Sequence, residues 1–222
     1  MPTALIIGAS RGLGRAMTEE FLKRGWNVIG TVLEADGLAD LKDDRLTVER
    51  LDTTDWPGVD ALRDKLGRRP LDLLMMNAGI KGPSEVPIAD ADPDEYARLM
   101  LVNVLAPLRL VDRYADLVLP AGTVSVMSSG MGSIARNTYA TWEAYRTSKA
   151  ALNMGMKSIA ARRNDSRTYI LANPGWTKTA MGGDDAPLTI EESIPPLVDM
   201  LERRAGSGGL HYADYKDEDI PW

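Results

Sequence analysis

Short apolar runs alternate along the chain with segments whose apolar residues recur every three or four positions. The run at residues 4–7 contains no polar side chain and ends at Gly8, which is typical of a parallel strand buried on both faces. From Leu13 to Phe21 the apolar residues follow a helical spacing, and Gly25 is placed to end that helix. The chain therefore opens with a predicted strand, a glycine-rich loop and a helix.

Further apolar runs continue this alternation. They predict strands at residues 28–32, 46–51, 71–76, 123–127, 169–172 and 210–213. Helical segments separate most of them, as in repeated strand–helix–strand units. We therefore predict an α/β fold, a single doubly wound (Rossmann) domain over residues 1–222 with a parallel sheet of about seven strands and helices on both faces. The short polar segment 34–44 has room for only one or two helical turns.

The predicted helix after the fourth strand contains a proline. It begins at Asp92, whose carboxylate can cap it, with Glu95 placed to complete a capping box, and it continues to Leu117. Pro107 lies inside this helix and has no N–H to donate to the carbonyl of Asn103, four residues earlier. We expect a local disturbance, either a simple kink whose free carbonyl binds water or a carbonyl freed for a functional contact.

Composition narrows the classes of function. The chain has no cysteine and a single histidine, His211, so neither a disulfide nor a zinc site is expected, and the histidine is assigned a structural role. A formal net charge of -6 without an extended run of Lys or Arg disfavours nucleic-acid binding. The N-terminal apolar run is too short for a signal peptide or a membrane span. We therefore expect a cytoplasmic protein that binds neither nucleic acid nor membrane.

A glycine-rich stretch, GASRGLG at residues 8–14, follows the first predicted strand and opens the first helix. In this context glycines let the backbone approach a pyrophosphate at the positive end of a helix. The spacing departs from the commonest dinucleotide fingerprint, so a tight structural turn is the alternative interpretation.

Several motifs occur in one order along nearly the whole chain, and together they resemble the short-chain dehydrogenase/reductase family. They are GASRGLG, Asn77-Ala78-Gly79 after the fourth predicted strand, Asn103 in the next helix, Ser128-Ser129 after the fifth strand, Tyr145-x-x-x-Lys149, and Pro174-Gly175 after the sixth strand. Within that family, SSGMGSI, AYRTSKAALNM, NPGWTKTAMGG and the final Ile220-Pro221-Trp222 resemble the carbonyl-reductase subgroup related to sniffer and to the C-factor signalling protein.

The resemblance implies four catalytic residues, Asn103, Ser129, Tyr145 and Lys149. Tyr145 is expected to act as general acid or base, and Ser129 to hydrogen-bond the substrate oxygen, with Ser128 as the competing choice. Successive strand residues point to opposite sides, so only one of the two serines should face the site. The main-chain carbonyl of Asn103 is expected to hold a water that connects to Lys149, and Pro107 offers a mechanism for freeing it.

Tyr145 and Lys149 are four residues apart in a helix predicted over residues 142–163, so their side chains share a face. A unit charge about 4 Å from the phenol at an effective dielectric near 20 contributes about 4 kcal/mol. That contribution would bring the pKa of Tyr145 from about 10 to near neutrality. Such a phenol can donate a proton to a carbonyl oxygen during reduction or accept one from an alcohol during oxidation.

The resemblance also implies a nicotinamide cofactor, and the sequence favours NADP over NAD. An acidic residue at the end of the second strand would bind the ribose hydroxyls of NAD, but Val32 and Leu33 occupy that place. Arg11 resembles the arginine that meets the 2′-phosphate in NADP-preferring relatives, while Glu34 favours NAD if the register shifts by two. The implied cofactor contacts are Gly8, Ser10, Arg11, Gly12, Leu13, Gly14, Asp52, Asn77, Ala78, Gly79, Tyr145, Lys149, Pro174, Gly175 and Thr177.

We therefore expect an NADP-dependent enzyme, without a metal, that moves a hydride between the cofactor and a carbonyl or alcohol substrate. The alternative is a dinucleotide-binding signalling or regulatory protein of the C-factor type. The segment 176–187, where the family has its substrate lid, is short, and Trp142, Met131, Trp176 and Met181 are candidate walls of the substrate site. Members of the family usually associate through two long helices, so a homodimer or homotetramer is expected.

Overall fold

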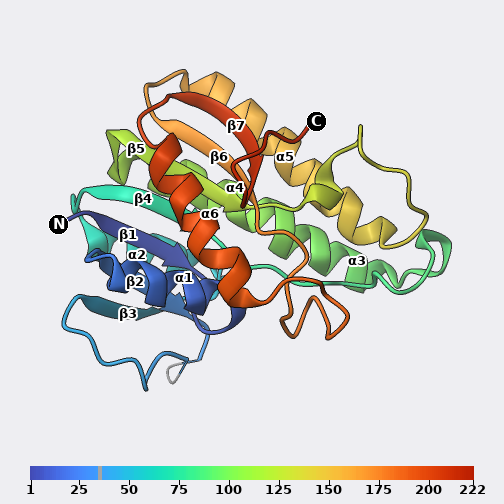
Figure 1. Ribbon diagram of the computed structural model, residues 1–222, viewed down its shortest axis with the longest axis horizontal. Helices are drawn as coiled ribbons and strands as arrows, with labels where there is room; N and C mark the ends of the chain where they lie inside the picture. The colour runs from blue at the N-terminus through green and yellow to red at the C-terminus, as the bar shows by residue number, and fades with distance from the viewer. Residues whose placement is uncertain (35–36) are drawn as a thin grey trace.

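The computed structural model describes residues 1–34 and 37–222. Within these residues seven strands pair in parallel in one sheet, in the order β3-β2-β1-β4-β5-β6-β7 (Figure 1). The strands are β1 (Thr3–Ile7), β2 (Asn27–Val32), β3 (Leu46–Arg50), β4 (Leu71–Met76), β5 (Val118–Met127), β6 (Thr168–Asn173) and β7 (Gly209–Asp214). The order reverses between β1 and β4, which confirms the predicted doubly wound fold.

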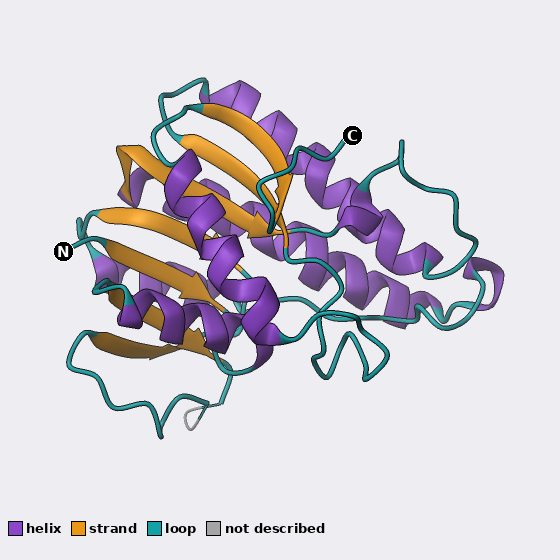
Figure 2. Ribbon diagram, in the orientation of Figure 1, coloured by secondary structure: helices purple, strands orange, loops and turns teal. Residues whose placement is uncertain are grey.

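Helices cover both faces of the sheet (Figure 2). Ala4 and Ile6 of β1 belong to one apolar cluster, whereas Leu5 and Ile7 belong to the other. Because successive strand residues point to opposite faces, the uninterrupted apolar run of β1 serves both layers. The first cluster is covered by α1 (Gly12–Lys23) and α6 (Ile190–Arg204), and the second by α2 (Trp56–Leu66), α4 (Ala106–Tyr114) and α5 (Glu143–Arg163).

The strand boundaries lie within one residue of the prediction, except at β5. That strand begins at Val118, five residues early, and its pairing with β4 is irregular between Leu71 and Leu73. Pro120 and Gly122 interrupt the apolar pattern there, so the pattern does not extend the predicted strand back to Val118. Residues 37–44 form turns and irregular chain, so the helical turns expected in segment 34–44 are absent from its described part, and 35–36 lie outside it.

The long helix predicted after β4 is built in pieces. α3 (Pro93–Met100) leads into a π-helical segment, Leu101–Leu105, which α4 follows directly, and a 3₁₀ turn (Ala115–Leu117) ends the run. Pro107 is the second residue of α4, so the predicted disturbance takes the form of a widened turn just before the proline.

The N-terminus of α3 is capped from one side only. The Asp92 carboxylate accepts hydrogen bonds from the backbone N–H groups of Asp94 and Glu95, both at 2.9 Å. Within the described residues Glu95 returns no bond to the Asp92 backbone, so the predicted capping box is wrong. A complete capping box is found instead at α6, between Thr189 and Glu192.

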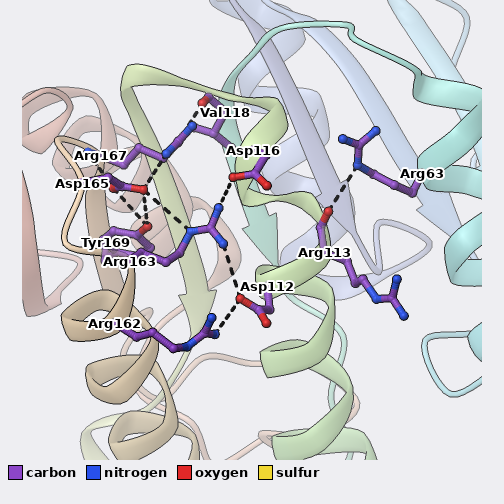
Figure 3. A network of polar contacts seen from close by, with 10 residues as sticks. All are labelled: Arg63, Asp112, Arg113, Asp116, Val118, Arg162, Arg163, Asp165, Arg167 and Tyr169. Atoms are coloured by element: carbon purple, nitrogen blue, oxygen red, sulfur yellow. Dashed lines mark hydrogen bonds and ion pairs between the residues drawn. The ribbon is translucent and has the colours of Figure 1, made fainter.

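A charged network fastens the C-terminal end of α5 at the amino ends of β5 and β6 (Figure 3). The Arg163 side chain, which is 13% exposed, lies among the carboxylates of Asp112, Asp116 and Asp165. Arg162 binds Asp112 at 2.7 Å as well, which ties α5 to α4. The network therefore anchors the C-terminal end of α5. The first turns of α5 lie at the carboxyl ends of the strands, where Lys149 bonds to Met127.

No helix within the described ranges combines the length and hydropathy that a bilayer crossing requires.

Candidate active site

The predicted site residues follow strands that end at the same edge of the sheet. Gly8 follows β1, Asn77 follows β4, Ser129 follows β5 and Pro174 follows β6. Because these strands are parallel and the strand order reverses between β1 and β4, their carboxyl ends meet at a crevice. This is the edge at which open α/β sheets bind their ligands.

The glycine loop is fixed against the end of β4. Gly8 has φ +87°, and a Cβ there would lie 2.8 Å from the Ala78 backbone nitrogen. A Cβ on Gly14 would lie 2.0 Å from the Gly8 carbonyl oxygen, so neither position tolerates a side chain. The Asn77 amide donates to the same Gly8 carbonyl at 2.8 Å. Asn77 therefore positions the loop, a role that the sequence analysis did not predict.

The first turn of α1 is left open to a ligand. Its N-cap residue, Arg11, makes no capping bond through its side chain, and the first turn contains no acidic residue. A Cβ on Gly12 would meet only the Thr179 methyl group, at 3.9 Å. Uncapped N–H groups at the positive end of a helix, under an open glycine, fit a dinucleotide pyrophosphate.

The other predicted cofactor contacts of the glycine loop differ in exposure. Arg11 is exposed and Ser10 is half-buried. Leu13 is half-buried and packs against the apolar cluster beneath α1 and α6. Asp52 accepts hydrogen bonds from the backbone N–H of Thr54 at 2.8 Å and from its hydroxyl at 2.7 Å, which lowers the pKa of Asp52. Asp52 therefore caps a local turn through Thr54.

The end of β2 carries no acidic side chain. Val32 is the last residue of the strand and is buried, and Leu33 is 53% exposed. Arg50 pairs with Val32 in the register of β3, and its Nε donates to the Leu33 carbonyl at 3.2 Å. The structure thus places an arginine, Arg50, beside the end of β2, where the sequence predicts contact with the adenosine ribose of the cofactor. Sequence reasoning missed Arg50 because only strand pairing places β3 beside the end of β2.

The residues after β6 form a tightly packed loop beside the glycine loop, since a Cβ on Gly12 would lie 3.9 Å from the Thr179 methyl group. Gly175 has φ +76°, and a Cβ there would lie 2.6 Å from the Leu188 side chain. Pro174 is buried and its carbonyl accepts from the hydroxyls of Thr177, at 3.3 Å, and Ser193, at 2.6 Å. These bonds fix the start of the segment that was predicted as a substrate lid.

Tyr145 and Lys149 lie on one face of α5, as their spacing predicted. The Lys149 Nζ is 5.5 Å from the centre of the Tyr145 ring and donates to the Met127 carbonyl at 2.8 Å. Lys149 is only 5% exposed. A Cβ on Gly79 would lie 3.9 Å from the same Nζ, so the chain after β4 closes over the lysine.

The predicted pKa of Tyr145 is wrong for this structure. Burial raises the pKa of the Tyr145 phenol above its ordinary value, and burial lowers the pKa of Lys149 to about 8. The ammonium is held by the Met127 carbonyl over the face of the tyrosine ring, so desolvation outweighs attraction between the two groups. The phenol is therefore protonated at neutral pH, which suits a proton donor.

The two serines after β5 have different surroundings. The Ser128 hydroxyl is 2% exposed and donates to the Asn153 Oδ1 at 2.6 Å. The Ser129 Oγ accepts from the Met131 backbone N–H at 3.2 Å, and its own proton goes to no partner among the described residues. Ser129 is therefore the serine whose hydroxyl proton is left for a ligand.

The Asn103 side chain is fully engaged in hydrogen bonds. Its amide accepts from the Ile80 N–H and donates to the Ile80 carbonyl, both at 2.8 Å, and also donates to the Ser148 hydroxyl at 3.3 Å. It is buried in the middle of the π-helical segment. The side chain therefore holds the residue after Gly79 in place, a role that the sequence analysis missed although a buried asparagine in an apolar helix is a signal for such a clamp.

Among the candidate wall residues, Trp142 contacts Tyr145 directly, with ring centres 5.8 Å apart. Trp176 is 57% exposed and donates to the Gly182 carbonyl at 2.8 Å.

His211 bonds locally to Ser207 and Gly208 near the start of β7, at the end of the sheet opposite the site, as expected for a structural residue.

Comparison with known proteins extends these observations. A Burkholderia multivorans protein solved with bound NADP is 45% identical, with a TM-score of 0.95 over 100% of this chain and 99% of its own. A carbonyl reductase from Pseudomonas aeruginosa PAO1 in complex with NADP is 37% identical, with a TM-score of 0.89 over the whole of both chains. The C-signal protein of Myxococcus xanthus is 33% identical over 69% of this chain and 93% of its own length.

These similarities confirm the predicted resemblance to carbonyl reductases and to the C-factor type of protein. The family model described as short chain dehydrogenase matches residues 2–187, which include the glycine loop, Asn103, Ser129, Tyr145 and Lys149. The chain therefore belongs to the short-chain dehydrogenase family.

Proposed function

We propose that this protein is an NADPH-dependent carbonyl reductase, which reduces an aldehyde or ketone to an alcohol and catalyses the reverse reaction at high alcohol concentration. The observation that carries the proposal is the pairing of Tyr145 with the buried Lys149, together with the uncommitted hydroxyl of Ser129. All three lie at the carboxyl edge of the sheet, where the glycine loop and the open first turn of α1 fit a dinucleotide.

In this mechanism Tyr145 is the general acid. Its raised pKa keeps the phenol protonated at neutral pH, so it can donate a proton to the substrate carbonyl oxygen. Ser129 donates a hydrogen bond to the same oxygen and holds it beside the phenol. When bound, NADPH supplies the hydride that goes to the carbonyl carbon. Lys149, held over the tyrosine ring, stabilises the phenolate that remains, and a proton from solvent restores the phenol.

Asn103 has two proposed roles. Its side chain holds Ile80, and its main-chain carbonyl, just before Pro107, holds a water that connects Lys149 to solvent. The π-helical segment supports the second role, because such segments occur frequently at functional sites and Pro107 offers no N–H to the Asn103 carbonyl.

The preference for NADP over NAD rests on charge at the end of β2. Arg11 and Arg50 offer guanidinium groups to a 2′-phosphate, and Val32 and Leu33 offer no carboxylate to the ribose hydroxyls of NAD. The NADP bound to two similar structures supports the same choice.

We also propose that the protein is a cytosolic homodimer or homotetramer. Leu105 is 52% exposed and Met154 is 64% exposed, on the outer side of the layer that contains α4 and α5. Apolar side chains exposed on neighbouring helices fit a contact between copies of the chain. Light scattering of the purified protein tests the proposal, and a monomer at all concentrations would contradict it.

The decisive experiment compares the wild type with Tyr145→Phe. NADPH consumption with a panel of aldehydes and ketones should be lost in the variant, whereas NADPH binding, followed by its fluorescence, should stay within about twofold. The similarity to C-signal favours one alternative, a regulatory protein that binds the dinucleotide as a ligand. Binding of NADPH without turnover of any carbonyl by the wild type would support that alternative and contradict the reductase.

A further inference from the structure

Trp142 has a backbone conformation that is unfavourable for a tryptophan. Its φ is +62° and its ψ is +34°, in the left-handed region. Among the described residues the other non-glycine positions with positive φ are Asn164 and Asp217, two residue types that tolerate this region. Strain at a bulky residue persists when the surrounding contacts require that side chain at that place.

The contacts of the indole place it at the reacting end of the site. Its ring meets the Tyr145 ring edge-on, with centres 5.8 Å apart and planes at 85°. The Lys81 ammonium, from the loop after β4, lies 5.0 Å from the centre of the indole. The aromatic pair therefore has a cation on each side. Lys81 faces the Trp142 ring and Lys149 faces the Tyr145 ring. Trp142 is only half-buried, so the residue remains partly accessible from solvent.

The surrounding loops expose several large apolar side chains. The loops after β4, β5 and β6 extend from the same end of the sheet (Figure 1). They carry Val86, Ile88, Ile134, Tyr139 and Trp176, which are 42%, 47%, 76%, 69% and 57% exposed. Two charged side chains near the indole are engaged locally, since Lys81 is paired with Glu85 and the Glu143 carboxylate accepts from the Ile88 N–H at 2.6 Å.

We propose that Trp142 is a specificity-determining residue that contacts the substrate and selects an aryl aldehyde or aryl ketone. The inference rests on the proposed reductase function and names its substrate class. A carbonyl oxygen that reaches the Tyr145 hydroxyl places its carbon substituents beside the indole. A flat aromatic substituent gains the ring–ring attraction that a saturated ring of the same size cannot gain.

The test compares benzaldehyde with cyclohexanecarbaldehyde, which have the same carbon skeleton and differ in the flatness of the ring. For each, kcat/KM is measured by NADPH consumption, and the ratio of the two values is compared between variants, which cancels the intrinsic reactivity of the aldehydes. Trp142→Gly removes the indole and relieves the backbone strain, since glycine adopts positive φ freely. Trp142→Phe keeps an aromatic ring at equal strain, and Trp26→Phe, near the opposite edge of the sheet, controls for loss of an indole elsewhere.

The ratio of kcat/KM for benzaldehyde to that for cyclohexanecarbaldehyde is expected to fall about threefold to tenfold in Trp142→Gly. It should stay near the wild-type value in Trp142→Phe and Trp26→Phe, with NADPH affinity within about twofold in all variants. An unchanged ratio in Trp142→Gly overturns this inference and leaves the reductase intact, as does a wild type that reduces other carbonyls but neither probe. NADPH binding without turnover of any carbonyl overturns the proposed function and this inference together.

Discussion

Replacing Lys149 with methionine is expected to raise the free energy of unfolding at neutral pH while abolishing turnover. Burial lowers the pKa of Lys149 from 10.5 to about 8, so the folded protein holds a poorly solvated charge. At about 1.4 kcal/mol for each pKa unit, the charge costs about 3 kcal/mol of stability below pH 8. Methionine has a similar length and no charge, but it loses the bond to the Met127 carbonyl, which contributes about 1 kcal/mol. The net gain is about 2 kcal/mol.

The pH dependence gives the sharper measurement. Between the folded pKa of about 8 and the unfolded pKa of 10.5, the unfolded chain binds a proton at Lys149 that the folded chain does not. Stability therefore rises with pH in this window for the wild type and lacks that component in Lys149→Met. The advantage of the variant should shrink from about pH 8 upward and be lost above about pH 11, where the lysine is neutral in both states.

Urea unfolding without nucleotide, at neutral pH and at about pH 11, measures the difference in free energy of unfolding between the variant and the wild type and its change with pH. Lys23→Met is the matched control, because the Lys23 side chain is 79% exposed and its removal should not change the pH dependence. The reasoning is refuted if Lys149→Met is less stable than the wild type at neutral pH, or if its difference from the wild type is the same at both pH values.

Three further predictions concern the cofactor, the far end of α5 and the π-helical turn. Arg11→Ala and Arg50→Ala are each expected to raise the KM for NADPH about tenfold and to leave that for NADH unchanged in steady-state assays, and equal effects on both cofactors would exclude a phosphate contact. Arg163→Met should lower the free energy of unfolding by about 1–2 kcal/mol in urea, since its carboxylate partners are partly exposed, and a neutral result would contradict the anchoring role. Pro107→Ala is expected to restore a regular bond to the Asn103 carbonyl, slow turnover and shift its pH profile, whereas an unchanged profile would remove that carbonyl from the mechanism.

The strands were predictable because parallel strands are buried on both faces and appear as continuous apolar runs. The start of β5 was missed because Val118 pairs with Leu71 across an irregularity that depends on β4. The disturbance at Pro107 could be predicted from the missing N–H, but its form as a π-helical turn depends on how α3 and α4 pack.

By itself the sequence determined the fold class, the order of the motifs and the shared face of Tyr145 and Lys149, since periodicity and helical spacing are local properties of the chain. Only the tertiary structure decided the direction of the pKa shifts of that pair, the different hydrogen-bond partners of Ser128 and Ser129, and the approach of Arg50 to Leu33 and of Lys81 to Trp142. These features depend on burial and on contacts between residues far apart in the chain. Desolvation and strand pairing arise only when the layers close around the sheet, so no local pattern encodes them.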